Sequence, residues 1–195
     1  MTMICGVEFS DVIRRRRMVR HYSDRPLAAE VVERVLASAL RAPSAGFTQG
    51  WAFLALTEPA DRARFWPYCP VRVERTPSMQ NAPLVVVVLA HKQAYLDRYG
   101  EPDAEATWPA PYWFVDAGMA ALLILLSAVD EGPGASFFGV QKTYLGRLRA
   151  EFGIPEEYSP VGAITIGYRA ADLPPQDPRM TAHRRSMADV VHRGH

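Results

Sequence analysis

The clearest strand pattern in the chain is APLVVVVLA at residues 82–90, in which four consecutive valines run from Val85 to Val88. A strand that is apolar on both faces is typical of the interior of a sheet whose faces are covered by helices. Shorter apolar segments at 51–57, 135–140 and 160–168 predict three further strands. We therefore expect a sheet built around an inner strand.

A helical period of apolar residues precedes the first of these strands, at residues 25–43. The apolar positions are Val31, Val32, Val35, Leu36, Ala39 and Leu40. Ser23 and Asp24 are candidate capping residues before this helix, and Pro43 is expected to end it.

Further helices are predicted over residues 8–20, 59–66, 111–130 and 141–153. Residues 91–110 are polar and contain proline, which indicates a loop, and the segment 91–113 is placed to act as a lid. Residues 168–195 hold three prolines and are predicted to form a mostly irregular tail.

The segment 111–130 is apolar on nearly all sides. Its run from Phe114 to Val129 is interrupted by Asp116 and is shorter than the roughly 20 residues that a bilayer span requires. A helix of this kind must be buried over most of its surface. We expect a central helix packed against another subunit rather than a membrane span, with Asp116 as a hydrogen-bonded structural carboxylate.

The predicted elements fit one layered domain of helices and strands over residues 1–195. Hydrophobic residues make up 49% of the chain and charged residues 22%, which is typical of a globular protein. Neither G-x-G-x-x-G nor a P-loop sequence occurs. A nucleotide-like cofactor would therefore be held by some other arrangement.

The positive charge is concentrated near the N-terminus, although the 22 basic and 21 acidic residues nearly cancel. Five arginines, Arg14 to Arg17 and Arg20, fall within seven residues. Nucleic-acid binding calls for a basic domain rather than one basic run, so we expect no nucleic-acid partner. The forked guanidinium group suits phosphate or carboxylate, which favours a clamp on one small anionic ligand. Arg14 and Arg15 are expected to be solvated.

Cys5 and Cys69 are the two cysteines of the chain, and they form no metal-binding or redox spacing. The N-terminal residues lack the apolar core of a secretory signal, since Glu8, Ser10 and Asp11 interrupt it. We expect a cytoplasmic protein with no disulfide framework and no metal site.

Three separated segments resemble one known family. Residues 16–27, RRMVRHYSDRPL, are similar to an Arg-Arg-Ser-x-Arg-x-Phe/Tyr signature followed by proline. Residues 42–56, APSAGFTQGWAFLAL, look like an Ala-Pro-Ser-x-x-Asn-x-Gln-Pro-Trp loop that runs into a strand. Residues 153–168 and then HRRSMADVV at 183–191 resemble a closing strand and a basic tail. Together with the apolar helix and small-residue strand between them, these segments resemble the FMN-dependent nitroreductase family.

The resemblance implies an α+β fold of three layers, in which a mixed, mainly antiparallel central sheet has helices on both faces. It also implies a homodimer with FMN at the interface. Three positions depart from the family pattern: Met18 replaces the signature serine, Phe47 replaces the loop asparagine, and Gly50 replaces the proline before the tryptophan.

For the cofactor, the resemblance implies that Arg16, Arg17 and Arg20 reach the FMN phosphate and ribityl chain, with Arg184 or Arg185 closing from the tail. Ser44 would bond the flavin or the ribityl chain. The complete set expected at the cofactor is Arg16, Arg17, Met18, Arg20, Pro43, Ser44, Ala45, Phe47, Gln49, Phe138, Gly139, Arg184 and Arg185.

Several of these residues have a structural alternative. Phe47 is either a stacking residue or a core residue, and Phe138 and Gly139 either offer backbone N–H groups to flavin N5 and O4 or form a plain core strand. Trp108, Tyr112 and Trp113 either line a substrate pocket together with Phe47 or pack in the dimer.

The activity implied is that of an FMN-dependent oxidoreductase. NADH or NADPH would reduce flavin N5, and a planar acceptor such as a nitroaromatic, a quinone or a flavin would then take the electrons in a ping-pong cycle. No side chain is needed as a catalyst. Two alternatives stay open: an oxidase or reductase of a specialised metabolite with the same fold, and a non-catalytic protein that sequesters FMN.

Overall fold

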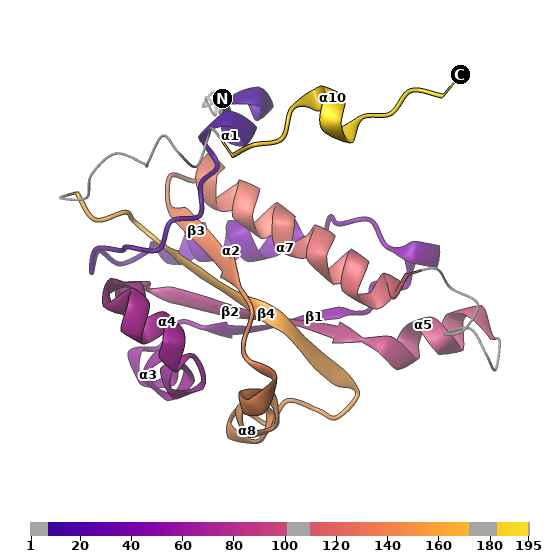
Figure 1. Cartoon of the computed structure of the whole chain (residues 1–195). Helices are drawn as coiled ribbons and strands as arrows, with labels where there is room; N and C mark the ends of the chain where they lie inside the picture. Colours follow the sequence, from indigo (N-terminus) through magenta and orange to yellow (C-terminus); the bar gives the residue numbers. More distant parts are fainter. Residues whose placement is uncertain (1–7, 101–109, 172–182, 195) are drawn as a thin grey trace, which may run out of the picture.

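A computed structural model gives the structure of the chain and describes residues 8–100, 110–171 and 183–194. Among these residues, four antiparallel strands form one sheet in the order β1-β2-β4-β3 (Figure 1). The inner strands are β2 (Leu84–His91) and β4 (Tyr158–Gly167), and the edge strands are β1 (Trp51–Leu56) and β3 (Gly134–Phe138). The valines of β2 are completely buried, which confirms the predicted inner strand.

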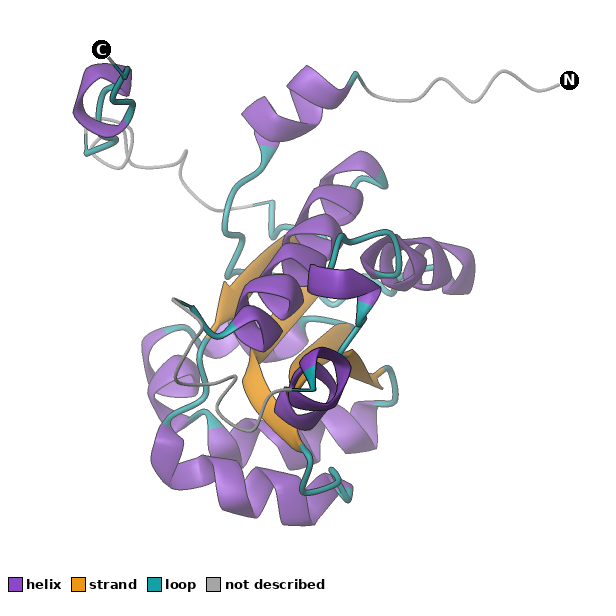
Figure 2. Ribbon diagram, turned by 90° about the vertical axis from the view of Figure 1, so that its right-hand side faces the viewer, coloured by secondary structure: helices purple, strands orange, loops and turns teal. Residues whose placement is uncertain are grey.

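Helices cover both faces of the sheet, which confirms the three-layer α+β architecture (Figure 2). On one face, Val86 and Val88 pack in a core with α2 (Ala29–Ala39) and α7 (Tyr112–Asp130). We call this side the α7 layer. On the other face, Val85 and Val87 pack in a second core. The helices there, α3 (Pro59–Phe65), α4 (Pro70–Arg75) and α8 (Lys142–Phe152), form the α8 layer.

The sheet differs in one respect from the mixed arrangement that the resemblance implies. All pairings between its strands are antiparallel, and parallel pairing among the described residues is limited to an isolated bridge from Met18 to Ala135. Residues 16–22 thus run beside β3 without forming a regular strand.

The N-terminal helices are shorter than predicted. Helix α1 (Phe9–Arg15) ends at the arginine run rather than at residue 20. Helix α2 begins at Ala29 and is preceded by Ala28, with no side-chain cap. Ser23 and Asp24 are therefore not its capping residues, because the chain continues through Pro26 before the helix begins.

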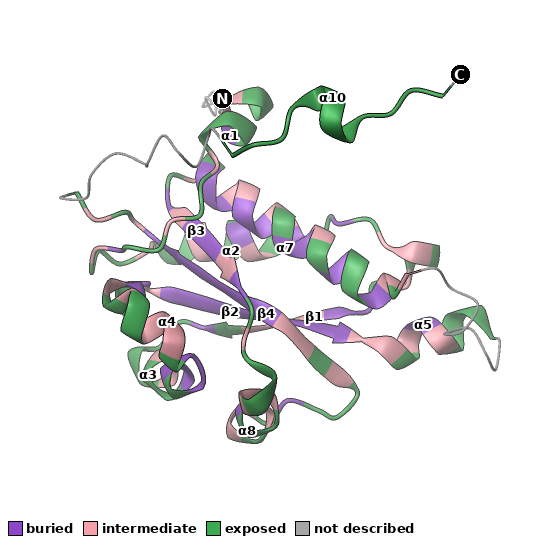
Figure 3. Cartoon of the chain, in the orientation of Figure 1, coloured by how far each residue is buried: buried purple, intermediate pink, exposed green. Residues whose placement is uncertain are grey.

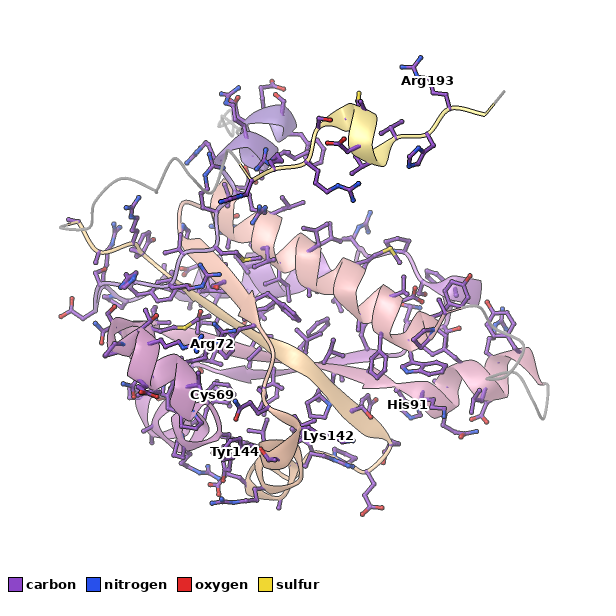
Figure 4. All side chains as sticks on the ribbon, viewed as in Figure 1. Cys69, Arg72, His91, Lys142, Tyr144 and Arg193 are labelled. Carbon is purple, nitrogen blue, oxygen red and sulfur yellow. The ribbon has the colours of Figure 1, made fainter. Side chains whose placement is uncertain are left out.

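The predicted loop at 91–110 is wrong in its first half, since residues Lys92–Tyr99 form helix α5 directly after β2. His91, at the strand-to-helix junction labelled in Figure 4, caps this helix: its Nδ1 accepts a hydrogen bond of 2.9 Å from the N–H of Ala94. Gly100 ends the helix in a left-handed conformation. A helix begun by histidine has no common sequence signature, which explains why the pattern did not predict it.

Short elements complete the described fold. Sequence patterns did not predict α4, the 3-10 turns η1 (Ala45–Phe47), η2 (Trp66–Tyr68) and η3 (Pro77–Asn81), or α10 (Met187–Val190) in the tail. Each has six residues or fewer, which is less than two helical turns, so none shows a repeated apolar pattern.

By length and composition alone, helix α7 is long and apolar enough to cross a membrane. In this fold it instead contacts α2 and all four strands, as the predicted central helix should. Asp116 lies inside this helix and is 1% exposed.

Candidate functional site

The arginine run begins at the end of helix α1, and most of its arginines have no carboxylate partner among the described residues. Arg14 pairs with Asp11 at 2.5 Å, whereas no salt bridge is found among the described residues for Arg15, Arg16, Arg17 or Arg20. The guanidinium of Arg17 donates instead to the backbone carbonyls of Arg14 and Arg16. Residues 16–20 therefore offer positive charge that the described part of the chain does not neutralise.

The segment that carries these arginines is held against β3. The N–H of Val19 donates to the carbonyl of Ala135 at 2.9 Å. Gly134 makes room for this approach, since a Cβ at that position would lie 2.4 Å from Cγ2 of Val19. The buried ring of Tyr22 fixes the far end, with its hydroxyl 3.0 Å from the carbonyl oxygen of Thr165. We call residues 16–22 the arginine arm.

The loop from Pro43 to Gly50 adopts an unusual backbone. Phe47 and Gln49 have positive φ angles of 55° and 53°, a region that costs a residue with a Cβ roughly 1–2 kcal/mol. Local hydrogen bonds hold this shape: the N–H of Gln49 donates to Oγ of Ser44 at 3.0 Å, and Oγ1 of Thr48 donates to the carbonyl of Ala45 at 2.6 Å. A strained loop whose backbone is fixed on several sides is typical of a ligand-binding segment.

Phe47 extends from this loop into solvent, with 77% of its surface exposed. The alternative of a buried core phenylalanine is therefore wrong. Its ring borders an open groove between the loop and α5, which is lined by Gly46, Phe47, Thr48, Ala94, Asp97 and Arg98.

Asp116 connects this loop to two helices. Its Oδ2 accepts hydrogen bonds from the N–H of Ala45 and from the hydroxyl of Tyr95 on α5, both at 2.8 Å. The prediction that Asp116 is a hydrogen-bonded structural carboxylate is confirmed. Burial raises the pKa of Tyr95 above its ordinary value, and the bond to Asp116 and its charge raise it further, so this hydroxyl stays protonated and donates.

Two glycines allow α5 to lie against the loop. A Cβ on Gly50 would lie 2.3 Å from Cε2 of Tyr95, and a Cβ on Gly46 would lie 2.9 Å from the hydroxyl of Tyr99. Gly50 stands where the family pattern has proline, and the ring of Tyr95 occupies the space that a larger residue would need. The replacement of the family's proline by Gly50 is thus explained by the close approach of Tyr95 on α5.

The arm and the loop lie at opposite ends of α7 (Figure 1). The loop contacts Asp116 near the start of the helix, whereas the arm lies beside Gly134 and Ala135, just after the helix ends at Asp130. The rise from Asp116 to Asp130 is about 21 Å at 1.5 Å per residue.

Between these ends, one face of α7 is apolar and uncovered, as the exposed parts of α7 in Figure 3 show. Phe114, Val115 and Leu122 are 41–47% exposed, and Gly118 between them has no neighbour within 4 Å of a Cβ position.

A model of the nitroreductase family matches residues 13–168. The chain belongs to the nitroreductase family. It is 30% identical over 165 residues to a protein of Archaeoglobus fulgidus named NADH dehydrogenase/NAD(P)H nitroreductase, a match that covers 80% of this chain and 83% of that one.

Solved structures share the nitroreductase fold. An FMN-dependent nitroreductase from Clostridium difficile superposes with a TM-score of 0.71 at 24% identity, over 94% of this chain and 98% of that one. A nitroreductase from Exiguobacterium sibiricum in complex with FMN superposes with a TM-score of 0.75 at 19% identity, over 99% of this chain and all of that one. At these identities the likeness shows the fold.

Within this nitroreductase fold, the aromatic residues expected at the substrate pocket separate. Trp113 is 5% exposed and packs edge-on against Tyr95, at 6.5 Å between ring centroids. Tyr112 is half-buried beside this core, and Trp108 lies outside the described residues. Among the described residues of that set, Phe47 is the aromatic side chain that faces solvent.

The residues expected near flavin N5 lie at the end of β3. Phe138 is buried in the α8 layer, where its ring stacks on Trp66 at 6.5 Å, so its side chain belongs to the core. Gly139 follows the strand and is exposed. A cofactor contact here would come from the backbone of these two residues.

The tail arginines do not join the arginine arm within one described chain. Residues 183–194 are all exposed, and the guanidinium of Arg185 donates to the carbonyl of Asp189 in the tail itself. In Figure 2, α10 lies apart from the arginine arm and α1.

Sequence patterns did not identify Tyr95 as a site residue, and they placed it in a loop. The available signal was the pair of glycines in the loop, Gly46 and Gly50, since glycine at such positions indicates a close approach by another segment.

Proposed function

We propose that this protein is an FMN-dependent oxidoreductase that takes electrons from NADH or NADPH and passes them to a planar organic acceptor. The observation that carries the proposal is the arginine arm, whose charges at Arg16, Arg17 and Arg20 have no carboxylate partner among the described residues. The names of the relatives, which include NAD(P)H and FMN, agree with it.

The chemistry of the arm fits a phosphate monoester. A phosphate carries nearly two negative charges near neutral pH, and guanidinium groups bind its oxygens in pairs. The arm is also fixed, because Val19 and Tyr22 anchor it to the sheet on both sides of Arg20. A fixed arm loses little conformational entropy when it binds the ligand.

The chemistry of the loop fits a flat ring system. Ala45 has only a methyl side chain and Gly46 has none, so the backbone can approach a planar ligand closely. Ser44 and Gln49 add polar groups on the same turn. Pro43 precedes this turn and is exposed beside it.

Within one chain, the arginine arm and the loop from Pro43 to Gly50 lie far apart. A second copy of the chain can bring an arm and a loop together. If two chains pack their exposed α7 faces antiparallel about a two-fold axis, the start of one helix meets the end of the other. The loop of one subunit then faces the arginine arm of its partner. The apolar residues Phe114, Val115 and Leu122 would be buried by that contact. The tails, with Arg184 and Arg185, would extend over the partner subunit.

Bound FMN would supply the redox chemistry, accepting hydride from the nicotinamide and delivering electrons to the acceptor. The protein's own residues would bind and orient. Arg16, Arg17, Arg20 and the tail arginines would hold the phosphate, and the loop would hold the ring. Met18 would contribute only its backbone, since its bridge to Ala135 fixes the main chain. The ring of Phe47 would stack against a planar acceptor.

A direct test reconstitutes the protein with FMN and mixes it anaerobically with NADPH and, separately, with NADH. Loss of the yellow colour within seconds is expected with at least one donor, followed by return of the colour when a quinone is added. Initial rates at several concentrations of both substrates should give parallel double-reciprocal lines, the signature of a ping-pong cycle.

A second candidate is a protein that sequesters FMN, because the exposed ring of Phe47 could cover the flavin. The same test separates the two candidates, since colour that persists with both donors contradicts the reductase. A specialised-metabolite oxidase or reductase would instead lose its colour with the donor and regain it slowly with simple quinones.

The arginine clamp has its own test. Arg20→Ala and Arg185→Ala are expected to lose FMN during gel filtration while keeping the far-UV circular dichroism of the parent. Arg75→Ala, at the end of α4 in the α8 layer, is the matched control and should retain FMN. Full retention of FMN by both clamp variants would contradict the assignment.

A further inference from the structure

The loop that is proposed to face FMN is tied at both of its ends to one buried pair of side chains. At its start, the N–H of Ala45 donates to Oδ2 of Asp116 at 2.8 Å. At its end, Gly50 packs directly against the ring of Tyr95, since a Cβ on Gly50 would lie 2.3 Å from Cε2 of that ring.

The two ties are connected to each other. The hydroxyl of Tyr95 donates to the same Oδ2 of Asp116, at 2.8 Å. Both side chains are buried, and the ring of Tyr95 is wedged between Gly50 and the ring of Trp113. A buried carboxylate that accepts two hydrogen bonds fixes both donors tightly. A donor that left it would be buried with neither the carboxylate nor water as a partner, which is costly.

Between the two ties lies the strained part of the loop. Phe47 and Gln49 have left-handed backbones that a free loop would relax. A chain in which the ties are cut would spend part of its time in other loop conformations. The apparent affinity for a ligand is the intrinsic affinity multiplied by the fraction of chains that hold the competent conformation.

We propose that Asp116 and Tyr95 are positioning residues of the cofactor site: they hold the loop of residues 44–49 in its strained conformation, and α5 is a fixed wall of the site rather than a moving lid. This inference rests on the proposed FMN function. It assigns a role to an interior residue of α7 and to a helix that neither the family pattern nor the sequence periodicity marked.

The geometry ranks three variants. Asp116→Ala removes the acceptor of both hydrogen bonds, from Ala45 and from Tyr95, and should weaken FMN binding most. Tyr95→Phe keeps the ring against Gly50 and removes the hydroxyl, so it cuts one of the two bonds to Asp116 and no longer holds the ring in place. The expected rise in the dissociation constant is about 5- to 20-fold. Asp116→Asn keeps an oxygen that can accept both bonds, without the charge, and should lie closest to the parent.

A matched control lies in the α8 layer. The hydroxyl of Tyr68 also donates to a carboxylate, Oε2 of Glu151, at 3.2 Å. Tyr68→Phe therefore removes the same kind of hydrogen bond on the other side of the sheet. It should lower the melting temperature by an amount similar to Tyr95→Phe and leave the affinity for FMN within twofold of the parent.

The experiment titrates FMN into each full-length apo-protein and follows the quenching of flavin fluorescence. Thermal melts of the same samples and visible circular dichroism of the bound flavin accompany the titration. The account predicts a weaker and spectrally altered FMN complex for Tyr95→Phe, partial recovery in Asp116→Asn relative to Asp116→Ala, and an unaltered complex for Tyr68→Phe.

Two outcomes would overturn the inference. In one, the folded Tyr95→Phe and Asp116→Asn variants bind FMN as the parent does. In the other, Tyr68→Phe weakens FMN binding as much as Tyr95→Phe, so that the effect follows stability alone. Should Asp116→Ala fail to fold, the other two variants still decide. A parent protein that binds no FMN would instead contradict the proposed function, which keeps the two failures distinct.

Discussion

The two helical layers of this protein differ in how much apolar surface they leave exposed. In the α8 layer, α3, α4 and α8 expose no large hydrophobic side chain, and Arg64 bonds Glu151 and Asp61 at 2.7 and 3.0 Å. On the α7 side, apolar residues of α1, α7 and α10 remain exposed. The strained residues of the described backbone, Phe47 and Gln49, also lie on this side.

The comparison of the two layers indicates which residues stabilise the fold and which are available for function. In the α8 layer the large apolar side chains of α3, α4 and α8 are covered within one chain, so they serve the core. The α7 side leaves apolar surface exposed in one chain. Under the proposed function, that surface would pack against a second subunit, the arginine arm would bind a phosphate, and the strained loop would face a flat ligand. The predictions below test that contrast, beginning with the largest effect.

The largest effect is expected from a charge on the exposed face of α7. Leu122→Glu would place a carboxylate within the proposed dimer contact, where burying an unpaired charge is strongly unfavourable. Light scattering after gel filtration should show a monomer near 21.7 kDa for this variant and twice that mass for the parent. Thr143→Glu, on the exposed start of α8, should remain dimeric. A parent protein that is already monomeric would contradict the contrast between the layers.

A methyl group at Gly50 should have the next largest effect. The new Cβ would lie 2.3 Å from the buried ring of Tyr95, so Gly50→Ala is expected to lower the free energy of unfolding by about 3 kcal/mol. Gly146→Ala is the control in α8, where a Cβ meets no atom within 4 Å and should stabilise the helix by up to about 1 kcal/mol. Urea unfolding measures both changes, and equal effects at the two glycines would contradict the close packing of α5.

The smallest effect concerns the thiol of Cys69, which lies with Arg72 in the α8 layer (Figure 4). Burial raises the pKa of this thiol to about 12 from an ordinary value near 9, although Arg72 opposes the shift. A raised folded-state pKa stabilises the protein below pH 9, and that contribution is lost as the pH rises toward 12. The free energy of unfolding of the parent, relative to Cys69→Ala, should therefore fall by about 1.4 kcal/mol between pH 8 and pH 10. A difference that does not change with pH would show that the thiol is accessible.

Much of the fold could be predicted from sequence, because its strongest patterns are local. The valines of β2 and the apolar run of α7 each mark a buried element without reference to the rest of the chain. The arginine run predicts an anion site in the same way. These features depend on residue type and spacing alone.

The positioning of the loop could not be predicted, because it depends on contacts between distant residues. Asp116 meets a backbone group 71 positions away and a hydroxyl 21 positions away. A buried aspartate in a helix indicates that partners exist but does not name them. The start of α5 at His91 likewise depends on one ring nitrogen that accepts from Ala94. The exposure of Phe47 follows from a left-handed backbone that no propensity favours for phenylalanine.

The claim on which this account depends is that one site takes its loop from one subunit and its arginine arm from the other. A mixed dimer tests it, with one chain carrying Arg20→Ala, the other carrying Gly46→Val, and a different affinity tag on each. Valine at position 46 must adopt a φ of 57° with its Cβ 2.9 Å from the hydroxyl of Tyr99, so it disables the loop. If the sites are shared between subunits, the mixed dimer regains one intact site and binds one FMN, while each parent variant binds none. A mixed dimer that binds no FMN would place the arm and the loop of each site in the same chain and contradict the account.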